Sequence, residues 1–555
     1  GYNSRNSVHE YGGGSFTVKN NNVFFTNWDD QRIYCIDNQK IFPVTPSPHA
    51  EKSLRYSDLT LTEDAKWLIC IRENHNNEGE PINEIVAVKT DGSLDVKILI
   101  SGNDFYSSPR LNKNNDKLTW TQWNHPNMPW DETELCMAQI DLKNCSIGEI
   151  NFIAGGSGVS ILQPEWSDKG DLIYVSDESG WWNLHKSNNG KNKNILDEPK
   201  EHAGPSWQFG FKTYDFYKKD NIILRGLSDD KKEGLIRILD LNGKIKEEIN
   251  LDHTQISYLN VHGDNLFFIG SSPSKNDEII KYSIEDKSIE IIKKSSDLEI
   301  PSSELSIAEE IKFSTTNNSK AYAFYYPPKN KNYSNKDLNP PLLVISHGGP
   351  TSAASNSLSL SIQFWTNRGF AVVDVNYRGS TGYGRKYRDE LKGNWGVYDA
   401  EDCIAAVKYL SEEKLIDPKK VVIKGGSAGG YTTINALTFY DNFAAGATYY
   451  GIADLSVFIN DTHKFESMYL ESLIGKYPKE KQKYYDRSAI NFTEKLSAPM
   501  IILQGSEDKI VPVSQAEIMA DALKKKQIPH ALIIFEGEQH GFRKAENIKS
   551  SLESE

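Results

Sequence analysis

The sequence predicts two domains, a β-propeller over residues 1–300 followed by an α/β-hydrolase domain over residues 301–555. Short apolar strands recur at an even spacing in the first half of the chain, which is typical of propeller blades. In the second half, strands alternate with helical stretches, as in a mostly parallel sheet. One Gly-x-Ser-x-Gly segment in that half lies between a strand and a helix, which is the pattern of a hydrolase nucleophile.

In the first half, turns rich in Asn, Asp and Lys repeatedly precede a short apolar strand. Blades of about 40–50 residues stack around a common axis in propellers, whereas two unrelated β-sandwiches would not predict an even spacing. Six repeats are visible, and a blade-like segment follows Gly1 almost directly. We therefore expect a chain trimmed at both ends and a seven-bladed propeller whose N-terminal part is missing. The steps of 45, 50, 54, 50 and 44 residues separate the strand residues Val23, Leu68, Leu118, Leu172, Ile222 and Leu266.

The pattern changes from about Ser302 onward. Apolar strands now alternate with helical stretches such as residues 400–410, which predicts a mostly parallel α/β sheet. Residues 329–339 are a polar loop, rich in Lys and Asn, inside this second domain.

Residues 421–431 contain the candidate nucleophile. A short, mostly apolar strand runs into a glycine-crowded turn with Ser427 at its apex, and a plausible helix follows. A serine on so sharp a turn sits in strained backbone, and neighbours with side chains would collide with the strand, the helix or the substrate. The helix that starts beside Ser427 favours negative charge there, because its first N–H groups are free. An ordinary Gly-rich turn is the alternative interpretation.

Partners for Ser427 follow in the order that an α/β-hydrolase requires, first an acid and then a histidine. Functional groups in such sheets lie just beyond the carboxyl ends of parallel strands. Asp508 follows the predicted strand 500–503, and His540 follows the predicted strand 531–535. The sequence therefore predicts a Ser427, Asp508, His540 triad.

Three other residues compete for the roles of acid and base. Glu507 is adjacent to Asp508 and could be the acid instead. His530 precedes its strand, so we expect it at the opposite edge of the sheet, and His463 has no position at a strand end.

The oxyanion hole is also predicted. The strand 342–346 is followed by residues 347–350, a His-Gly-Gly-Pro loop of the type that contributes one backbone N–H in hydrolases. We assign the two donors as the backbone N–H groups of Gly349 and Ala428. A plain Gly-Gly-Pro turn is the alternative.

A propeller followed by a Ser-Asp-His hydrolase domain resembles the prolyl oligopeptidase family of serine peptidases, in its acylaminoacyl-peptidase and dipeptidyl-aminopeptidase-like branch. The resemblance implies a serine peptidase that cuts short peptides, a propeller of seven blades that restricts access to the site, and a frequent homodimer. It does not decide between acylaminoacyl-, dipeptidyl- and oligopeptidase activity. The segments that carry it, besides the triad loops, are Val8–Gly14, 166–168, 179–184, 347–350, 376–384 and 461–467.

Substrate-binding residues are predicted from their positions at strand ends. Ile452 and Phe458 follow the strand 445–449, and Ile510 and Val511 follow Asp508. They could line an apolar pocket, although core packing would explain them equally well. The roles of the remaining candidates stay open. Arg378 could bind a carbonyl or carboxylate of the substrate, or it could form a structural ion pair. Glu10 and residues 131–134 could bind the free amine of a substrate, or they could belong to a solvated acidic loop.

Composition excludes several other classes. A net charge of −13 argues against nucleic acid or an anionic membrane as a partner, and no apolar run approaches the length of a membrane span. Five scattered Cys residues predict a reducing, cytoplasmic compartment without disulfides or a metal site. No metal or cofactor motif is present. Since we expect the true N-terminus upstream of Gly1, the sequence leaves open whether a signal peptide precedes it.

Two alternatives to a peptidase remain. An esterase or other acyl hydrolase could use the same triad on another acyl substrate. A binding protein could use the propeller alone, but the complete set of Ser427, Asp508 and His540 counts against an idle triad.

Overall fold

The computed structural model describes the chain except for residues 189, 228–233 and 335–338. Part of the polar loop expected over residues 329–339 therefore lies outside the described residues. The chain divides into two compact units, one of Gly1–Gly270 with Glu278–Lys293 and one of Ser271–Asp277 with Lys294–Glu555. The domain boundary expected between residues 300 and 301 lies a few residues after the division at Lys293.

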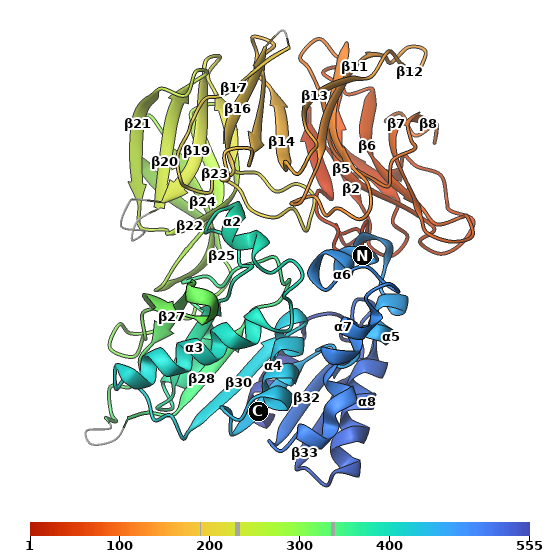
Figure 1. Cartoon of the computed structure of the whole chain (residues 1–555). Helices are drawn as coiled ribbons and strands as arrows, with labels where there is room; N and C mark the ends of the chain where they lie inside the picture. The colour runs from red at the N-terminus through yellow and green to blue at the C-terminus, as the bar shows by residue number, and fades with distance from the viewer. Residues whose placement is uncertain (189, 228–233, 335–338) are drawn as a thin grey trace. The chain divides into compact units, whose positions relative to one another are not determined.

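Six antiparallel sheets follow one another along the first unit and form a six-bladed propeller (Figure 1). Strands within a sheet pair in chain order, and β13 adds a further pairing to the third sheet. In chain order the sheets are β1 (Phe16–Lys19), β2 (Asn22–Thr26), β3 (Ile33–Asp37) and β4 (Lys40–Pro43); β5 (Leu54–Leu61), β6 (Trp67–Asn74), β7 (Ile82–Lys89) and β8 (Val96–Ile100); β9 (Phe105–Leu111), β10 (Lys117–Trp123), β11 (Glu134–Asp141), β12 (Ser146–Ile147) and β13 (Asn151–Gly155); β14 (Ile161–Trp166), β15 (Leu172–Ser176), β16 (Asn183–Asn188) and β17 (Lys191–Asn194); β18 (Tyr214–Tyr217), β19 (Asn221–Leu227), β20 (Gly234–Asp240) and β21 (Ile245–Leu251); β22 (Gln255–His262), β23 (Asn265–Ser272), β24 (Lys275–Ser283) and β25 (Ser288–Lys294).

Each repeat seen in the sequence is the hairpin between the first two strands of a sheet. The six apolar anchors all lie at the start of the second strand, in β2, β6, β10, β15, β19 and β23. The polar turns before them suit left-handed backbone, as Asn20 and Asn21 show with φ of 52° and 66° between β1 and β2. Two such residues give a turn that matches the twist of a hairpin. The even spacing in the sequence therefore reflects the presence of one such hairpin in each blade.

The described residues form six blades, and they do not support the expected seventh. Six repeats produce six sheets, one for each anchor, among the described residues. The segment before Phe16 makes isolated bridges, Ser4 with Asn27 and Gly13 with Phe209, instead of a sheet of its own. A seventh blade would need three or four further strands, which these residues do not supply.

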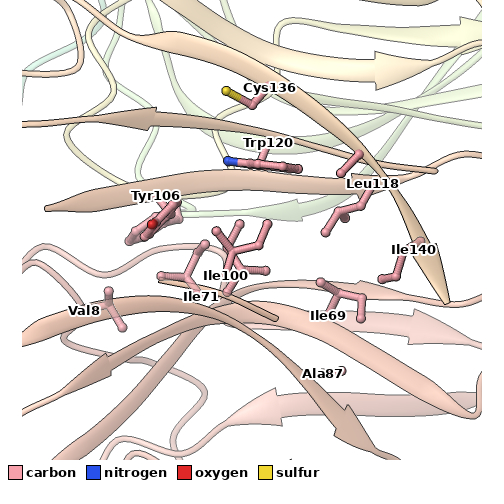
Figure 2. Close-up of a cluster of buried hydrophobic side chains, with 13 residues drawn as sticks. Val8, Ile69, Ile71, Ala87, Ile100, Tyr106, Leu118, Trp120, Cys136 and Ile140 are labelled. Atoms are coloured by element: carbon pink, nitrogen blue, oxygen red, sulfur yellow. The ribbon is translucent and has the colours of Figure 1, made fainter. Parts of the chain in front are cut away.

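Neighbouring blades bury their apolar faces against each other. Figure 2 shows one such cluster, in which Ile69 and Ile71 of β6 face Leu118 and Trp120 of β10. All four side chains are fully buried. Because alternate residues of a strand point to the same side, each blade offers one stripe of this kind to the next. A single blade could not bury that stripe alone, so the blades stabilise one another.

The second unit is built on one mixed sheet of eight strands in the order β26-β27-β29-β28-β30-β31-β32-β33. All pairs from β29 to β33 in this order are parallel. This agrees with the predicted α/β-hydrolase fold. The strands are β26 (Glu309–Ser314), β27 (Lys320–Tyr326), β28 (Leu342–Ser346), β29 (Ala371–Asn376), β30 (Val421–Gly426), β31 (Ala445–Tyr449), β32 (Met500–Gly505) and β33 (His530–Phe535).

Helices connect the parallel strands, and α3, α4 and α8 lie along the sheet in Figure 1. The helix expected over residues 400–410 is part of α3. None of the helices in the described part of the chain is both long and apolar enough to cross a membrane. The helices are α1 (Leu360–Thr366), α2 (Arg385–Asp389), α3 (Tyr398–Glu412), α4 (Ala428–Phe439), α5 (Leu455–Asp461), α6 (Tyr469–Leu473), α7 (Lys481–Asp486), α8 (Val513–Lys525) and α9 (Ala545–Ser554), with short 3-10 turns η1 (Thr316–Asn318), η2 (Lys464–Glu466) and η3 (Ala489–Lys495).

Candidate active site

Ser427 is the single residue between β30 and α4, and its backbone is strained, with φ 55° and ψ −121°. Its N–H donates to the carbonyl of Tyr449 at 2.9 Å, which anchors the turn to the end of β31. Glycine is required on both sides. A Cβ on Gly425 would lie 2.2 Å from the carbonyl oxygen of Gly429, and one on Gly429 would lie 2.0 Å from the carbonyl oxygen of Ser346. The glycines thus let strand and helix approach closely enough to hold Ser427 at the apex.

Asp508 and His540 form a hydrogen-bonded pair at the carboxyl ends of β32 and β33. The distance from His540 Nδ1 to Asp508 Oδ2 is 2.8 Å. The other carboxylate oxygen of Asp508 accepts from the backbone N–H groups of Ile510 and Val511, each at 2.9 Å. The Asp508 side chain is fully buried, and the His540 side chain is 16% exposed. The carboxylate is therefore fixed in place, and it orients the imidazole so that Nε2 is left for another partner.

The residues that competed with Asp508 and His540 for the roles of acid and base make other contacts. His530 is the first residue of β33 and pairs with Met500, the first residue of β32, so it sits at the opposite end of the strand from His540. His463 Nε2 lies 3.6 Å from Glu466. His540 Nδ1 donates to the carboxylate of Asp508, whereas the N–H of the neighbouring Glu507 donates to the carbonyl of Glu538.

Tyr450 connects the serine turn with the histidine, and sequence reasoning missed it. Its ring centroid lies 4.6 Å from that of His540. On the other side, a Cβ on Gly426 would lie 3.1 Å from the Tyr450 ring. Burial, together with the negative charge of Asp508, raises the pKa of Tyr450 to about 12, so the phenol stays neutral. Its position directly after β31 was the signal that could have found it.

The loop after β28 lies against Ser427. A Cβ on Gly348 would be 3.6 Å from the Cβ of Ser427 and 3.1 Å from the carbonyl oxygen of Gly426. Gly349 has φ 120°, a conformation that residues with side chains rarely adopt. Gly349 and Ala428 line one cavity together with Ser427. These two residues therefore border the same small space as the candidate nucleophile.

His347 holds that loop in shape. It is enclosed, and burial lowers its pKa to about 4, so the imidazole is neutral near pH 7. Its Nδ1 lies 2.8 Å from the carbonyl oxygen of Gly348, and its Nε2 lies 2.7 Å from the hydroxyl of Ser380. Since a carbonyl only accepts, we assign the proton to Nδ1, and Nε2 accepts from Ser380. The ring also stacks on Tyr377 at 4.2 Å.

The cavity beside Ser427 has a volume of about 350 Å³ and lies wholly within the second unit. The four pocket residues expected from strand ends, Ile452, Phe458, Ile510 and Val511, all line it. Side chains that sequence reasoning did not assign to the pocket line it as well, among them Trp395, Glu466 and Tyr469. Glu466 lies within residues 461–467, which the sequence identified only through a family resemblance. The complete lining is Gly349, Pro350, Trp395, Ser427, Ala428, Ile452, Phe458, Glu466, Tyr469, Leu470, Leu473, Ile510 and Val511.

Arg378 is not among the residues that line this cavity. Its side chain is fully buried, and Nε and Nη2 donate to Asp402 at 2.8–3.1 Å. The guanidinium also lies 3.8 Å from the ring centroid of Tyr398. These contacts correspond to the structural ion pair that the sequence left open as an alternative to substrate binding.

The acidic residues considered for binding an amine make contacts within the first unit. Glu10 forms an ion pair with Arg55 at 2.6 Å. Glu132 accepts from the N–H of Gly158 at 2.7 Å, and Glu134 accepts from a side-chain amide at 2.9 Å. Asp131 is buried and accepts from a backbone N–H in its own turn. Such contacts favour a structural role over amine binding for these four carboxylates.

All five cysteines are free, and four of them are buried. Among the described residues, no group of three or more His, Cys, Asp or Glu side chains is arranged to hold a metal ion.

Comparisons with known proteins agree with this geometry. A model of the prolyl oligopeptidase family matches residues 356–555. The dipeptidyl aminopeptidase BIII of Pseudoxanthomonas mexicana is 32% identical over 216 residues, which are 38% of this chain and 31% of that protein. The acylamino-acid-releasing enzyme 1 of Oryza sativa subsp. japonica is 31% identical over 217 residues, 37% of this chain and 28% of that protein. The match thus spans under a third of these curated relatives.

Solved structures match over the whole chain. A puromycin-hydrolyzing peptidase of Mycobacterium tuberculosis is 34% identical with a TM-score of 0.94, and the match covers 100% of this chain and 86% of that one. A puromycin hydrolase is 31% identical with the same TM-score and the same coverage.

Proposed function

Because this chain belongs to the prolyl oligopeptidase family, we propose that it is a serine peptidase that hydrolyses short peptides. The observation that carries the proposal is the Asp508–His540 hydrogen bond of 2.8 Å, at strand ends of the sheet that also presents Ser427 on its strained turn. The peptidase names of the relatives support it.

In the proposed reaction, the Ser427 hydroxyl attacks the acyl carbon of the substrate while His540 Nε2 accepts the hydroxyl proton. Asp508 stabilises the imidazolium that forms and keeps the ring in the required orientation. His540 then gives the proton to the leaving amine, and the peptide bond breaks. A water molecule, activated by the same histidine, hydrolyses the acyl-enzyme and regenerates Ser427.

The backbone N–H groups of Gly349 and Ala428 would bind the oxyanion of the two tetrahedral intermediates. Backbone donors held by rigid elements need no reorganisation when the charge develops, which is the source of their effect. The neutral His347 and its contact with Ser380 support the required loop shape. His347 is thus a positioning residue in this proposal and has no contact with the substrate.

The apolar walls of the cavity favour an acyl residue with an apolar side chain. The names of the relatives support two sub-activities, release of acylated residues and release of dipeptides. Internal cleavage of short peptides, as by an oligopeptidase, is the third sub-activity expected. Anilides of each kind, set against simple esters, separate these sub-activities. Turnover confined to the esters would favour the acyl-hydrolase alternative on the same triad.

The nucleophile is tested by covalent labelling. A fluorophosphonate probe should label the native chain stoichiometrically and leave Ser427→Ala unlabelled. Ser411→Ala, which removes a hydroxyl on α3 that does not line the cavity, should label like the native chain. Stoichiometric labelling of Ser427→Ala would show that another residue is the nucleophile.

A further inference from the structure

The cavity beside Ser427 contains a carboxylate that the proposed mechanism does not use. Apart from Glu466, the described residues of its lining carry no charge at neutral pH. Glu466 is 7% exposed as a whole residue. A carboxylate costs free energy to remove from water unless charged or polar groups compensate for the loss. The Glu466 carboxylate has a charged or polar neighbour within the protein, since it lies 3.6 Å from His463 Nε2. It also brings a charge into the wall of an otherwise apolar cavity.

The backbone that carries Glu466 is fixed to the rest of the site. Its N–H donates to the carbonyl of His463 at 3.0 Å, which closes the turn η2. Tyr469, at the start of the following helix α6, is hydrogen-bonded through its hydroxyl to Thr351, in the loop that also contains Gly349. The Glu466 side chain is therefore presented by a segment that is tied to the oxyanion loop.

Two further hydrogen bonds hold the end of this helix. The N–H of Gly393 donates to the carbonyl of Ser472 at 2.9 Å, and the N–H of Trp395 donates to the carbonyl of Leu473 at 3.3 Å. Trp395 and Leu473 also line the cavity. The wall around Glu466 is thus preorganised, which is what a specificity group requires.

We propose that Glu466 determines substrate specificity by binding the ammonium group of the residue whose acyl group is transferred to Ser427. The inference rests on the proposed peptidase function and names its substrate class. An ammonium is the common cation of peptides, and a carboxylate in an apolar cavity attracts it more strongly than one in water, because the local dielectric is low. The apolar side chains around it would bind the carbon atoms of the same residue.

Two kinds of substrate present such a group. In one, the ammonium is the free α-amine of the first residue, so the chain would release single residues from an unblocked N-terminus. In the other, it is the side chain of a lysine, and the α-amine can be blocked. Both place a cation on the acyl residue, and substrates distinguish them.

A structural role for Glu466 is the competing explanation, since His463 Nε2 lies 3.6 Å from its carboxylate. A purely structural pair would affect all substrates alike when it is changed. A specificity role would affect only the substrates that carry the ammonium. The test therefore compares substrates that carry the ammonium with one that lacks it, in the native chain and in the variant.

The experiment measures kcat/KM of the native chain and of Glu466→Gln for three anilides: leucine with a free amine, N-acetyl-leucine and N-acetyl-lysine. For the ammonium substrate that the native chain prefers, kcat/KM should fall at least about 30-fold, as for loss of one partner of a buried charge pair. For N-acetyl-leucine it should change less than about 3-fold. Glu471→Gln is the matched control, because Glu471 lies on α6 but not in the lining.

Two measurements keep the outcomes apart. Leucinamide or N-acetyl-lysinamide, but not N-acetyl-leucinamide, should slow fluorophosphonate labelling of Ser427, and Glu466→Gln should abolish this protection. The labelling rate does not depend on peptide hydrolysis. If the chain hydrolyses only esters, the proposed peptidase function is refuted, but the protection experiment still tests the role of Glu466. Glu466→Asp should restore part of the preference.

Equal losses for all three anilides in Glu466→Gln, or a native chain that prefers N-acetyl-leucine, would overturn the inference about Glu466. If the probe does not label Glu466→Gln at all, the same measurements are made on Glu466→Asp. An equal loss of kcat/KM for all three anilides in Glu466→Asp would also assign a structural role to Glu466.

Discussion

The pKa values of carboxylates are shifted in opposite directions in the two units, as two residues from each unit show. In the first unit, burial alone would raise the pKa of Glu73, but a hydrogen bond from His75 and the charges of His9 and Arg55 lower it to about 2. The pKa of Glu198 is also lowered to about 2, mainly by the hydrogen bond with a neighbouring histidine. Some of these partners are close in the sequence, as His75 is to Glu73, whereas His9 precedes the first strand and comes from a distant segment.

In the second unit, burial dominates instead. It raises the pKa of Asp374, in the middle of β29, to about 7, although the charge of Lys424 opposes the shift. It raises the pKa of Asp399, at the start of α3, to about 6, against a hydrogen bond from Thr432. Parallel strands covered by helices bury both faces of the sheet, so their polar groups lie far from solvent and from mobile cations.

Backbone strain occurs in both units. Positive φ angles in the first unit occur at hairpin turns, such as Ala65 and Asn115, and also inside strands, as at Asp58 of β5 and Ser108 of β9. In the second unit, Ser427 and Tyr450 have positive φ at the ends of buried strands, beside the candidate site. The comparison teaches that the units differ in how the charge of these carboxylates is balanced, by nearby cations in the first unit and not in the second. Strained backbone is common to both units, and in the second unit it includes the candidate nucleophile Ser427.

The largest expected effect is on catalysis. Asp508→Asn should lower kcat by about 10³- to 10⁴-fold, because the amide cannot stabilise the imidazolium of His540 or hold its tautomer. Turnover of the best anilide substrate measures this. Glu73→Gln, which disrupts a carboxylate of the first unit, is the control and should leave the rate of Ser427 labelling unchanged. Comparable losses in both variants would mean that the chemistry is not confined to the second unit.

Next comes the close packing of the serine turn. Gly429→Ala should destabilise the second unit by at least about 3 kcal/mol, since the new Cβ would meet the Ser346 carbonyl oxygen at 2.0 Å. Gly170→Ala, in a hairpin turn of the first unit with φ 82° and open space around it, should cost only about 1 kcal/mol. Urea unfolding followed by peptide-resolved hydrogen exchange reports each unit separately. Equal costs would contradict the proposed difference in packing.

The smallest expected effect is on the pH dependence of stability. The pKa of Asp374 is raised in the folded state, so its contribution to the stability of the second unit should increase as the pH falls from 7 to 4, by about 1–3 kcal/mol. The pKa values of Glu73 and Glu198 are lowered in the folded state. Their contributions to the stability of the first unit should stay complete down to about pH 4.5 and be lost from there toward pH 2.

Hydrogen exchange of peptides from β29 and from β6, measured at pH-corrected rates, tests this difference. Asp374→Asn should remove the increase in the second unit and leave the first unit unaffected. A parallel loss of protection in both units between pH 7 and 4.5 would refute it.

The sequence by itself determined the elements whose signals are local. The anchors such as Val23 and Leu118 predicted one hairpin each, because a polar turn before an apolar strand is a property of a few adjacent residues. Asp508 and His540 followed from their positions after strands, because carboxyl ends of parallel strands share one edge of a sheet. The two residues are 2.8 Å apart in the structure.

Only the tertiary structure decided which distant side chains meet. Arg378 is buried against Asp402, Tyr450 lies between Gly426 and His540, and Glu466 faces the cavity of Ser427. The pairing of strands into sheets belongs here too: each of the six repeats became one sheet of the propeller. The physical reason is that side-chain packing joins segments many residues apart, and no local pattern records which of them become neighbours.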